Sequence, residues 1–215
     1  MLSVLTRFVA PLSVAILLSA CTTPDPLTEE QIPMGNFRLG HNVVFSDKAV
    51  LGPLSRTADA GTWDEVLKDE VDRRFGRYEG EKLYHLGVSV DAYVLALPGI
   101  PIVASPKSIL IMNVTVWDDV ANKKLNEEAK RITVLESLSG ETVLSSGLTQ
   151  SKEQQQRNLA RNGAKAIQKW LLEHPEWFDI DEESAKLAAS KIEVKTIDAE
   201  KLAAEKAAAE KAAEN

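Results

Sequence analysis

The sequence of 215 residues is acidic, with a formal net charge of -7 and a pI near 5.1. This charge argues against nucleic acid as a partner, because nucleic-acid binding usually needs a basic face. The one cysteine, Cys21, excludes a disulfide within the molecule and a metal site built from cysteines.

The N-terminus has the pattern of a signal peptide. Arg7 precedes an apolar run from Phe8 to Leu18 that is broken only by Pro11 and Ser13. The run is about half of the roughly 20 residues that a membrane-spanning helix needs. We therefore expect residues 1–20 to be a cleaved export signal rather than a membrane span.

The end of this run, Leu18-Ser19-Ala20-Cys21, resembles the lipobox of bacterial lipoproteins. The resemblance implies that a signal peptidase recognises Leu18, Ser19 and Ala20, and that Cys21 carries a diacylglyceryl group and an acyl chain such as palmitate. Each buried acyl methylene contributes about 0.8 kcal/mol, so three chains hold a protein firmly in a membrane. Thr22 stands where an Asp would resemble an inner-membrane retention signal. The expected location is thus the periplasmic face of the outer membrane; the alternatives are a plain secretory signal or a chance apolar N-terminus.

The rest of the chain divides by composition. Residues 21–35 contain three prolines and scattered polar residues, which predict an extended, lipidated tether. Residues 36–178 alternate apolar patterns with turn signals and predict one α+β periplasmic domain. Residues 179–215 form an Ala/Glu/Lys-rich tail, helical or disordered, in which Glu-Lys pairs recur every five residues without building a coiled-coil seam.

The first half of the domain predicts a strand at 37–45 and then a helix. Thr62 and Glu65 have the spacing of a capping box. The basic residues near the far end, Arg73, Arg74 and Arg77, suit the helix dipole, and Gly80 can terminate the helix. Apolar residues recur at helical spacing and predict its buried face: Trp63, Val66, Leu67, Val71, Phe75 and Tyr78.

Strands follow, because the period then changes to two. The first has an apolar face of Leu86, Val88, Val90, Ala92, Val94 and Ala96. The second, at 108–117, has Leu110, Met112, Val114 and Val116 on one face and is apolar enough on the other to be central. A turn at 118–122 leads to a returning strand within 125–138, and a short last strand is expected at 142–146.

A second helix is predicted from Ser151, which forms a capping box with Gln154, to about Glu173. Its apolar stripe consists of Leu159, Gly163, Ile167, Trp170 and Leu171. Trp177 and Phe178 are expected to fold back as a hydrophobic latch. The acidic residues that follow, Asp179, Asp181, Glu182 and Glu183, are interpreted as the opening of a helix rather than a calcium loop.

The predicted fold is therefore an α+β two-layer sandwich, in which a largely antiparallel sheet of about five strands carries two helices on one face. This order of elements over roughly 36–178 is similar to that of small periplasmic lipoproteins, including auxiliary lipoproteins of lipid transport and the lipopolysaccharide-assembly lipoprotein. The chain also looks like one of the uncharacterised lipoprotein families of Gram-negative bacteria. Element order alone transfers no functional residue.

No catalytic set, cofactor motif or metal site is recognised. The three histidines, His41, His85 and His174, have no metal-ligand spacing, and no phosphate-binding glycine loop occurs. Ser89 lies on the same strand face as His85, but about 13 Å along the chain, too far for a hydrogen bond. The sequence therefore predicts a non-enzyme without cofactors.

One connection is unusually apolar. Residues 93–106 contain three prolines, and Leu97, Ile100, Pro101 and Ile102 either fold over the core or face a partner. The favoured function is an accessory lipoprotein held in the membrane by acyl chains on Cys21, binding or positioning another envelope protein. The alternatives are a module that binds a lipid or hydrophobic ligand beside this loop, and an enzyme with an unrecognised carboxylate site.

Overall fold

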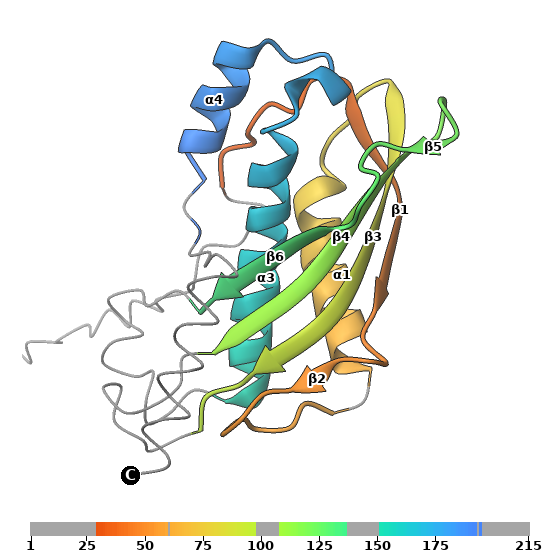
Figure 1. The fold of residues 1–215 in the computed structure, drawn as a ribbon. Helices are drawn as coiled ribbons and strands as arrows, with labels where there is room; N and C mark the ends of the chain where they lie inside the picture. Colours follow the sequence, from red (N-terminus) through yellow and green to blue (C-terminus); the bar gives the residue numbers. More distant parts are fainter. Residues whose placement is uncertain (1–28, 60, 98–107, 137–150, 193, 195–215) are drawn as a thin grey trace, which may run out of the picture.

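The structure, a computed structural model, describes residues 29–59, 61–97, 108–136, 151–192 and 194. Six strands form one sheet (Figure 1): β1 (Phe37–Phe45), β2 (Val50–Leu51), β3 (Lys82–Val94), β4 (Ile109–Asp118), β5 (Lys123–Lys124) and β6 (Lys130–Leu135). The helices are α1 (Thr62–Phe75), α3 (Lys152–Leu171) and α4 (Glu182–Ser190), with a 3₁₀ turn at Pro175–Trp177.

The sheet is mostly antiparallel, as predicted. β3 and β4 lie at its centre, with β1 and β2 pairing with β3 on one side and β5 and β6 pairing with β4 on the other. β4 runs antiparallel to β3, β5 and β6, whereas β1 and β2 run parallel to β3. The parallel β1–β3 pair follows from topology, because α1 connects these strands and carries the chain back across the sheet before β3 begins.

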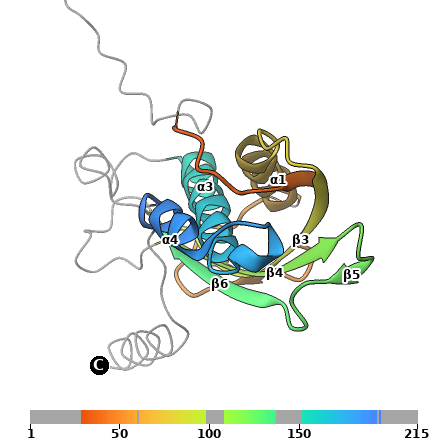
Figure 2. The ribbon, with the colours of Figure 1, turned by 90° about the horizontal axis from the view of Figure 1, so that it is seen from above.

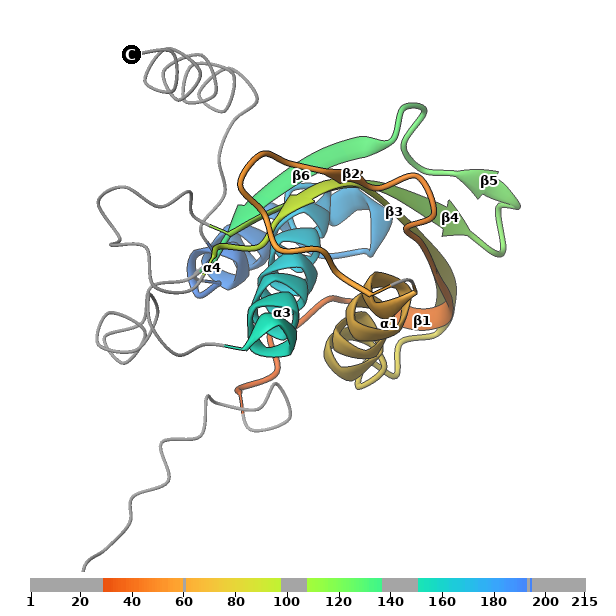
Figure 3. The same ribbon diagram turned by 90° about the horizontal axis from the view of Figure 1, so that it is seen from below.

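Helices α1 and α3 cover one face of the sheet (Figure 2), which confirms the two-layer arrangement. The core between the layers contains the predicted apolar faces of both helices and of β4; Leu110, Met112, Val114 and Val116 are each fully buried. Figure 3, which views the molecule from below, shows α1 and α3 on the same side of the strands, and neither lies on the opposite face of the sheet. There Ile111 is buried in a small cluster with Ala92, Ile109 and Leu135.

A β-bulge corrects the predicted face of β3. The register with β4 shifts between Val90 and Ala92. Even-numbered residues of β3 therefore face the helices before the bulge, and odd-numbered residues face them after it. Leu86, Val88 and Val90 are buried as predicted, but Tyr93 and Leu95 then take the core positions expected for Val94 and Ala96. The period of two holds on each side of the bulge and fails across it.

The two predicted capping boxes have different outcomes. Ser151 and Gln154 form the reciprocal box at the start of α3. At α1 the N-cap is Gly61, with φ of 78°, and the Thr62 hydroxyl donates to the Asp59 carbonyl instead of capping the helix. Helix α1 also ends earlier than expected, at Phe75 with Gly76 as its C-cap.

The segment after α3 packs on the core, both at the latch and beyond it. The latch forms, because Phe178 is fully buried and the Trp177 carbonyl accepts a hydrogen bond from the Tyr84 hydroxyl, 2.6 Å. Beyond residue 178, helix α4 continues the packing, with Ala188 and Ile192 joining the core cluster. The predicted strand at 142–146 and the Glu-Lys repeats after residue 195 lie outside the described residues.

Gly80 does not terminate α1 but allows two backbones to pass closely. Its amide donates to the Phe37 carbonyl, 3.0 Å, and a Cβ there would lie 2.2 Å from the carbonyl carbon and oxygen of Asn36. Backbone atoms cannot move aside as a flexible side chain can. Gly87, in the middle of β3, has open space, since its nearest neighbour would be the Thr115 carbonyl oxygen at 4.0 Å.

We therefore expect Gly80→Ala to lower the free energy of unfolding by about 1–3 kcal/mol, the usual cost of overpacking. Gly87→Ala, the matched control in the same sheet, should change it by less than about 1 kcal/mol. Urea unfolding followed by circular dichroism measures both. Equal destabilisation by the two substitutions would contradict the proposed close approach at Gly80.

Candidate functional site

The most elaborate polar site in the described chain is where the N-terminal segment meets the helices. Residues 29–34, here called the strap, lie against the end of α1 and the side of α3. The Glu29 carboxylate forms ion pairs with Arg74 Nη2, 2.7 Å from Oε2, and with Lys165 Nζ, 2.8 Å from Oε1. Arg77 Nη2 also donates to the Glu29 carbonyl, 3.1 Å.

A buried relay connects the two ends of the strap. Arg74 Nη1 donates to Gln168 Oε1, 2.7 Å, and Gln168 Nε2 donates to the Tyr78 hydroxyl, 2.6 Å. That hydroxyl donates in turn to the Ile32 carbonyl, 2.7 Å. The relay thus begins at Glu29 and returns to the strap at Ile32, and Met34 beyond it is 1% exposed.

Electrostatics support a charged form for Glu29 and a neutral form for Tyr78. Partial burial by itself raises the pKa of Glu29, but the hydrogen bonds and charges of Lys165 and Arg74 outweigh it, so that the pKa is lowered. Burial raises the pKa of Tyr78 to about 12. The strap is therefore held by a carboxylate between two cations and by a phenol that stays protonated at neutral pH.

This site was not predicted. Arg74 was interpreted as one of the basic residues that suit the dipole at the end of the helix, yet it is 7% exposed, and residues 29–34 were expected to belong to an extended tether. One signal existed in the sequence: Arg74 lies three residues after Val71 and seven after Leu67, on the apolar stripe of α1. An arginine on a buried stripe requires an anion. The sequence did not indicate that the anion was Glu29.

The predicted anchor and most of the predicted interaction loop lie outside the described residues. This applies to Leu18, Ser19, Ala20 and Cys21, and to Ile100, Pro101 and Ile102. Leu97, the first residue of that loop set, is described and is partly buried. Within the described part of the chain, no helix is long and apolar enough to cross a membrane.

Exposed apolar side chains gather elsewhere, at the edge of the sheet formed by β1, β2 and the connection after β2. We call this surface the β1–β2 apolar edge. Phe45 is 57% exposed and Leu54 67%. Its members account for five of the seven large hydrophobic residues described as exposed: Val43, Phe45, Val50, Leu51 and Leu54. The sequence pattern identified the apolar end of β1 but not that it faces solvent.

The polar face of β3 does not form a catalytic triad. His85 Nδ1 accepts from the His41 amide at 2.7 Å, and His85 Nε2 lies 3.0 Å from Asp119 Oδ1, so both ring nitrogens have partners. Asp91 instead accepts a hydrogen bond from Asn113 Nδ2, 2.7 Å, and lies 3.6 Å from Arg131.

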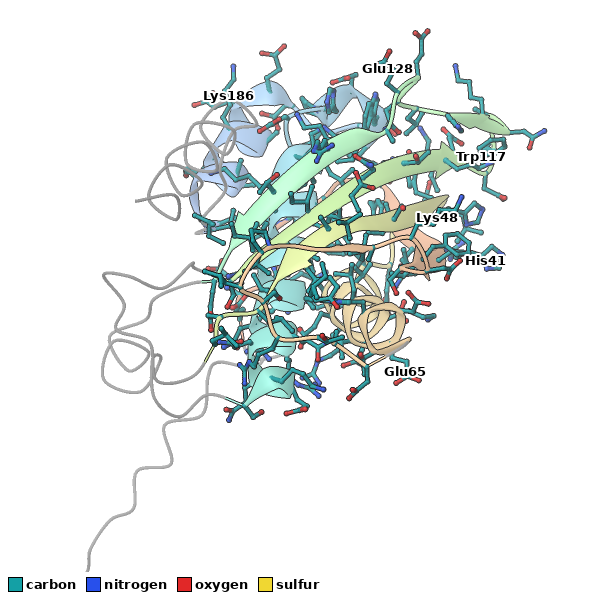
Figure 4. The ribbon with its side chains drawn as sticks, turned by 60° about the horizontal axis from the view of Figure 1, so that its bottom comes forward. His41, Lys48, Glu65, Trp117, Glu128 and Lys186 are labelled. Carbon is teal, nitrogen blue, oxygen red and sulfur yellow. The ribbon has the colours of Figure 1, made fainter. Side chains whose placement is uncertain are left out.

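Figure 4 shows His41 at the end of the sheet where Trp117 also lies. Within the residues the structure describes, no cluster of His, Cys, Asp and Glu could hold a metal ion.

A buried acid, Glu136, lies at the other end of the sheet. It is 7% exposed, and its Oε1 has no hydrogen-bond partner among the described residues. Burial raises its pKa, although hydrogen bonds to Ser108 and Asn158 and the charge of Arg56 act in the opposite direction.

The acidic residues after the latch have structural partners. Asp179 Oδ2 receives Lys82 Nζ at 2.8 Å and Asn36 Nδ2 at 2.9 Å. Asp181 is the N-cap of α4, and its carboxylate accepts from the Ser184 amide, 2.8 Å. The interpretation of this cluster as a helix opening is thus confirmed for Asp181, while Asp179 ties the latch to the start of β3.

Comparisons with known proteins found distant structural likenesses. No family model matches the chain, and no curated protein matches it. A crystal structure of a Xanthomonas campestris protein from family DUF330 is 13% identical and has a TM-score of 0.40, covering 69% of this chain and 93% of that one. A predicted lipoprotein from Caulobacter crescentus is 16% identical with a TM-score of 0.31, covering 57% and 88%.

A third structure is a predicted homologue of the neuraminyllactose-binding hemagglutinin from Helicobacter pylori. It is 12% identical with a TM-score of 0.28, covering 72% of this chain and 95% of that one. At these identities and TM-scores the likenesses assign no function to the chain.

We expect Glu29→Gln to lower the free energy of unfolding at pH 7 by about 1–3 kcal/mol, because Arg74 then lacks its anion. Glu30→Gln is the matched control; its exposed carboxylate lies 3.6 Å from Lys191, and we expect a change under about 0.5 kcal/mol. Urea unfolding of the wild type and both variants measures the difference.

The pH dependence has a definite sign. A lowered folded-state pKa means that Glu29 stabilises the fold above its unfolded pKa, near 4.5, and that this stabilisation disappears as the pH falls through the lower folded value. The gap between wild type and Glu29→Gln should therefore shrink below about pH 4.5. A gap that stays constant down to pH 3 would argue against a charged Glu29 in the folded state.

Glu136→Gln should have the opposite effect. The raised pKa of Glu136 means that its ionisation costs stability as the pH rises above about 4.5, so the neutral amide should stabilise the protein at pH 8 by on the order of 1 kcal/mol. The gain should vanish near pH 4. Glu128→Gln, at an exposed carboxylate, is the control and should leave thermal unfolding unchanged at both pH values.

Proposed function

We propose that this chain is a lipid-anchored accessory lipoprotein of the outer membrane, facing the periplasm, which positions another envelope protein and catalyses no reaction. The observation that supports this best is the strap. In this proposal the lipobox cysteine Cys21 is the anchor, and Glu29 is the first residue of the domain whose contacts the structure describes. Eight residue steps separate the two, a span of at most about 29 Å.

A short span matters for an anchored domain. The folded domain stays within about 29 Å of the lipidated cysteine, so it works close to the bilayer surface rather than at a long reach from it. A free tether that continued to β1 at Phe37 would add eight further residue steps to this span. Fixing the chain at Glu29 therefore suits a protein whose partner is itself close to the membrane.

The β1–β2 apolar edge is the surface we propose for a polypeptide partner. β3 is the one strand that β1 pairs with in the described sheet, and apart from the bridge between Arg38 and Glu79 no pairing is described on the other edge of β1. The backbone groups of its Val43–Phe45 end are therefore those we propose for hydrogen bonds to a partner. A partner strand could satisfy these groups while covering Phe45 and Val43, as in strand addition to a sheet edge. Lipid tails offer no such donors and acceptors, which favours a protein as the occupant.

The first experiment is mass spectrometry of the mature N-terminal peptide from fractionated membranes. We expect an acylated Cys21 in the outer-membrane fraction, and loss of both the acyl mass and the membrane association in Cys21→Ser. An unmodified chain in the soluble fraction would contradict the proposed lipoprotein anchor.

A second arm of this experiment tests the partner surface. A photocrosslinking residue at Phe45 should give a discrete adduct with one envelope protein. The same residue at Lys186, an exposed position on α4 (Figure 4), should not. Adducts at both positions, or at neither, would contradict the assignment of the β1–β2 apolar edge.

A further inference from the structure

The cations around Glu29 belong to a regular row. On α3, cationic residues recur every four positions at Arg157, Arg161, Lys165 and Lys169, and so lie along one side of the helix. Acidic residues of α1 pair with the first two of these cations: Asp69 lies 3.8 Å from Arg157, and Glu70 lies 3.4 Å from Arg161. At the level of Lys165, α1 supplies a cation instead, Arg74.

This arrangement leaves two neighbouring cations that the helices do not neutralise. Arg74 is 7% exposed, and its neighbour Gln168 is uncharged. A guanidinium removed from water needs an anion, because desolvation of an unpaired charge is costly. The anion comes from outside both helices: it is Glu29, brought in by the strap.

The carboxylate uses the site incompletely. Glu29 Oε2 meets Arg74 Nη2 only, and Arg74 Nε, on the same edge of the guanidinium, is buried without a partner among the described residues. An anion that accepts from both Nε and Nη2 would form the two parallel bonds that favour arginine in phosphate recognition. A third oxygen of the same anion could face Lys165, whose side chain is 23% exposed.

We propose that Arg74 and Lys165 form a phosphate-binding site, the Arg74–Lys165 site, which the chain's own Glu29 occupies in this structure. The ligand is a phosphate group, either free or in a lipid headgroup. It competes with Glu29 because both anions need the same two cations. Binding displaces Glu29 and lengthens the chain available between the anchor and the domain.

The increase in length is substantial if Cys21 is the anchor, a step that rests on the proposed function. With the strap released as far as the buried Met34, the maximum span from Cys21 grows from about 29 Å to about 47 Å. Phosphate at the Arg74–Lys165 site would therefore let the domain move farther from the membrane.

The test uses the full chain with Cys21→Ser, so that binding is measured without the membrane anchor and a failure of the anchor cannot be mistaken for a failure of the site. Inorganic phosphate is titrated into wild-type strap, Glu29→Gln and the control Glu30→Gln, with calorimetry as the readout. We expect Glu29→Gln to bind phosphate at least tenfold more tightly than the other two. Adding Lys165→Met to Glu29→Gln should remove this gain, while circular dichroism confirms folding.

A second measurement keeps Glu29 in place. In the Cys21→Ser background the chain has no cysteine, so Ile32→Cys introduces one thiol on the strap. Phosphate should increase its rate of alkylation several-fold, and chloride at equal ionic strength should not. The proposal would be overturned if Glu29→Gln and Glu30→Gln bound phosphate with equal affinity and phosphate did not change the alkylation rate of the Ile32→Cys thiol.

The source of the phosphate is distinguished by a vesicle arm. Phosphatidylglycerol vesicles that accelerate alkylation at a phosphate concentration where free phosphate has no effect would assign the site to a lipid headgroup. Acceleration by free phosphate alone would assign it to a soluble phosphate compound.

Discussion

The charge of Arg74 is the constraint on which the N-terminal half of this structure depends. A guanidinium on the buried stripe of α1 must be neutralised, and the neutralising group is a carboxylate from a segment 45 residues earlier. The ion pair therefore holds the strap against the helices, and the hydrogen bond from Arg74 to Gln168 joins α1 to α3. The relay through Tyr78 to Ile32 satisfies the Gln168 amide and the Tyr78 hydroxyl, whereas Arg74 Nε has no partner among the described residues.

The same end of the domain is closed in a similar way by another distant segment, the latch. The latch residue Phe178 packs on Phe37 and Tyr84, with ring centroids 5.5 Å and 5.0 Å away. Its carbonyl accepts from the Asn36 amide, 2.9 Å, so the start of β1 and the segment after α3 stabilise each other. The strap and the latch both act next to β1, which explains how an edge strand with one paired neighbour is held in place.

The two sides of this domain differ in how much apolar surface they expose. The helical face is closed by buried polar networks and aromatic contacts, whereas the opposite face and the β1–β2 apolar edge carry the exposed apolar groups. Interaction surfaces of this kind need no catalytic chemistry, and the function proposed here depends on position and exposed surface rather than on a reactive group.

Periodicity in the sequence was sufficient for the helices, for β4 and for the two-layer sandwich, because local patterns of 3.6 and 2 residues determine which face of an element is buried. The lipobox at Cys21 is a prediction that rests on four adjacent residues, and these lie outside the described part of the chain. Tertiary structure decided the rest. The bulge near Asp91, the parallel pairing of β1 and the ion pair between Glu29 and Arg74 all join residues far apart in the chain, and no local pattern specifies which distant group satisfies a buried charge or an unpaired strand.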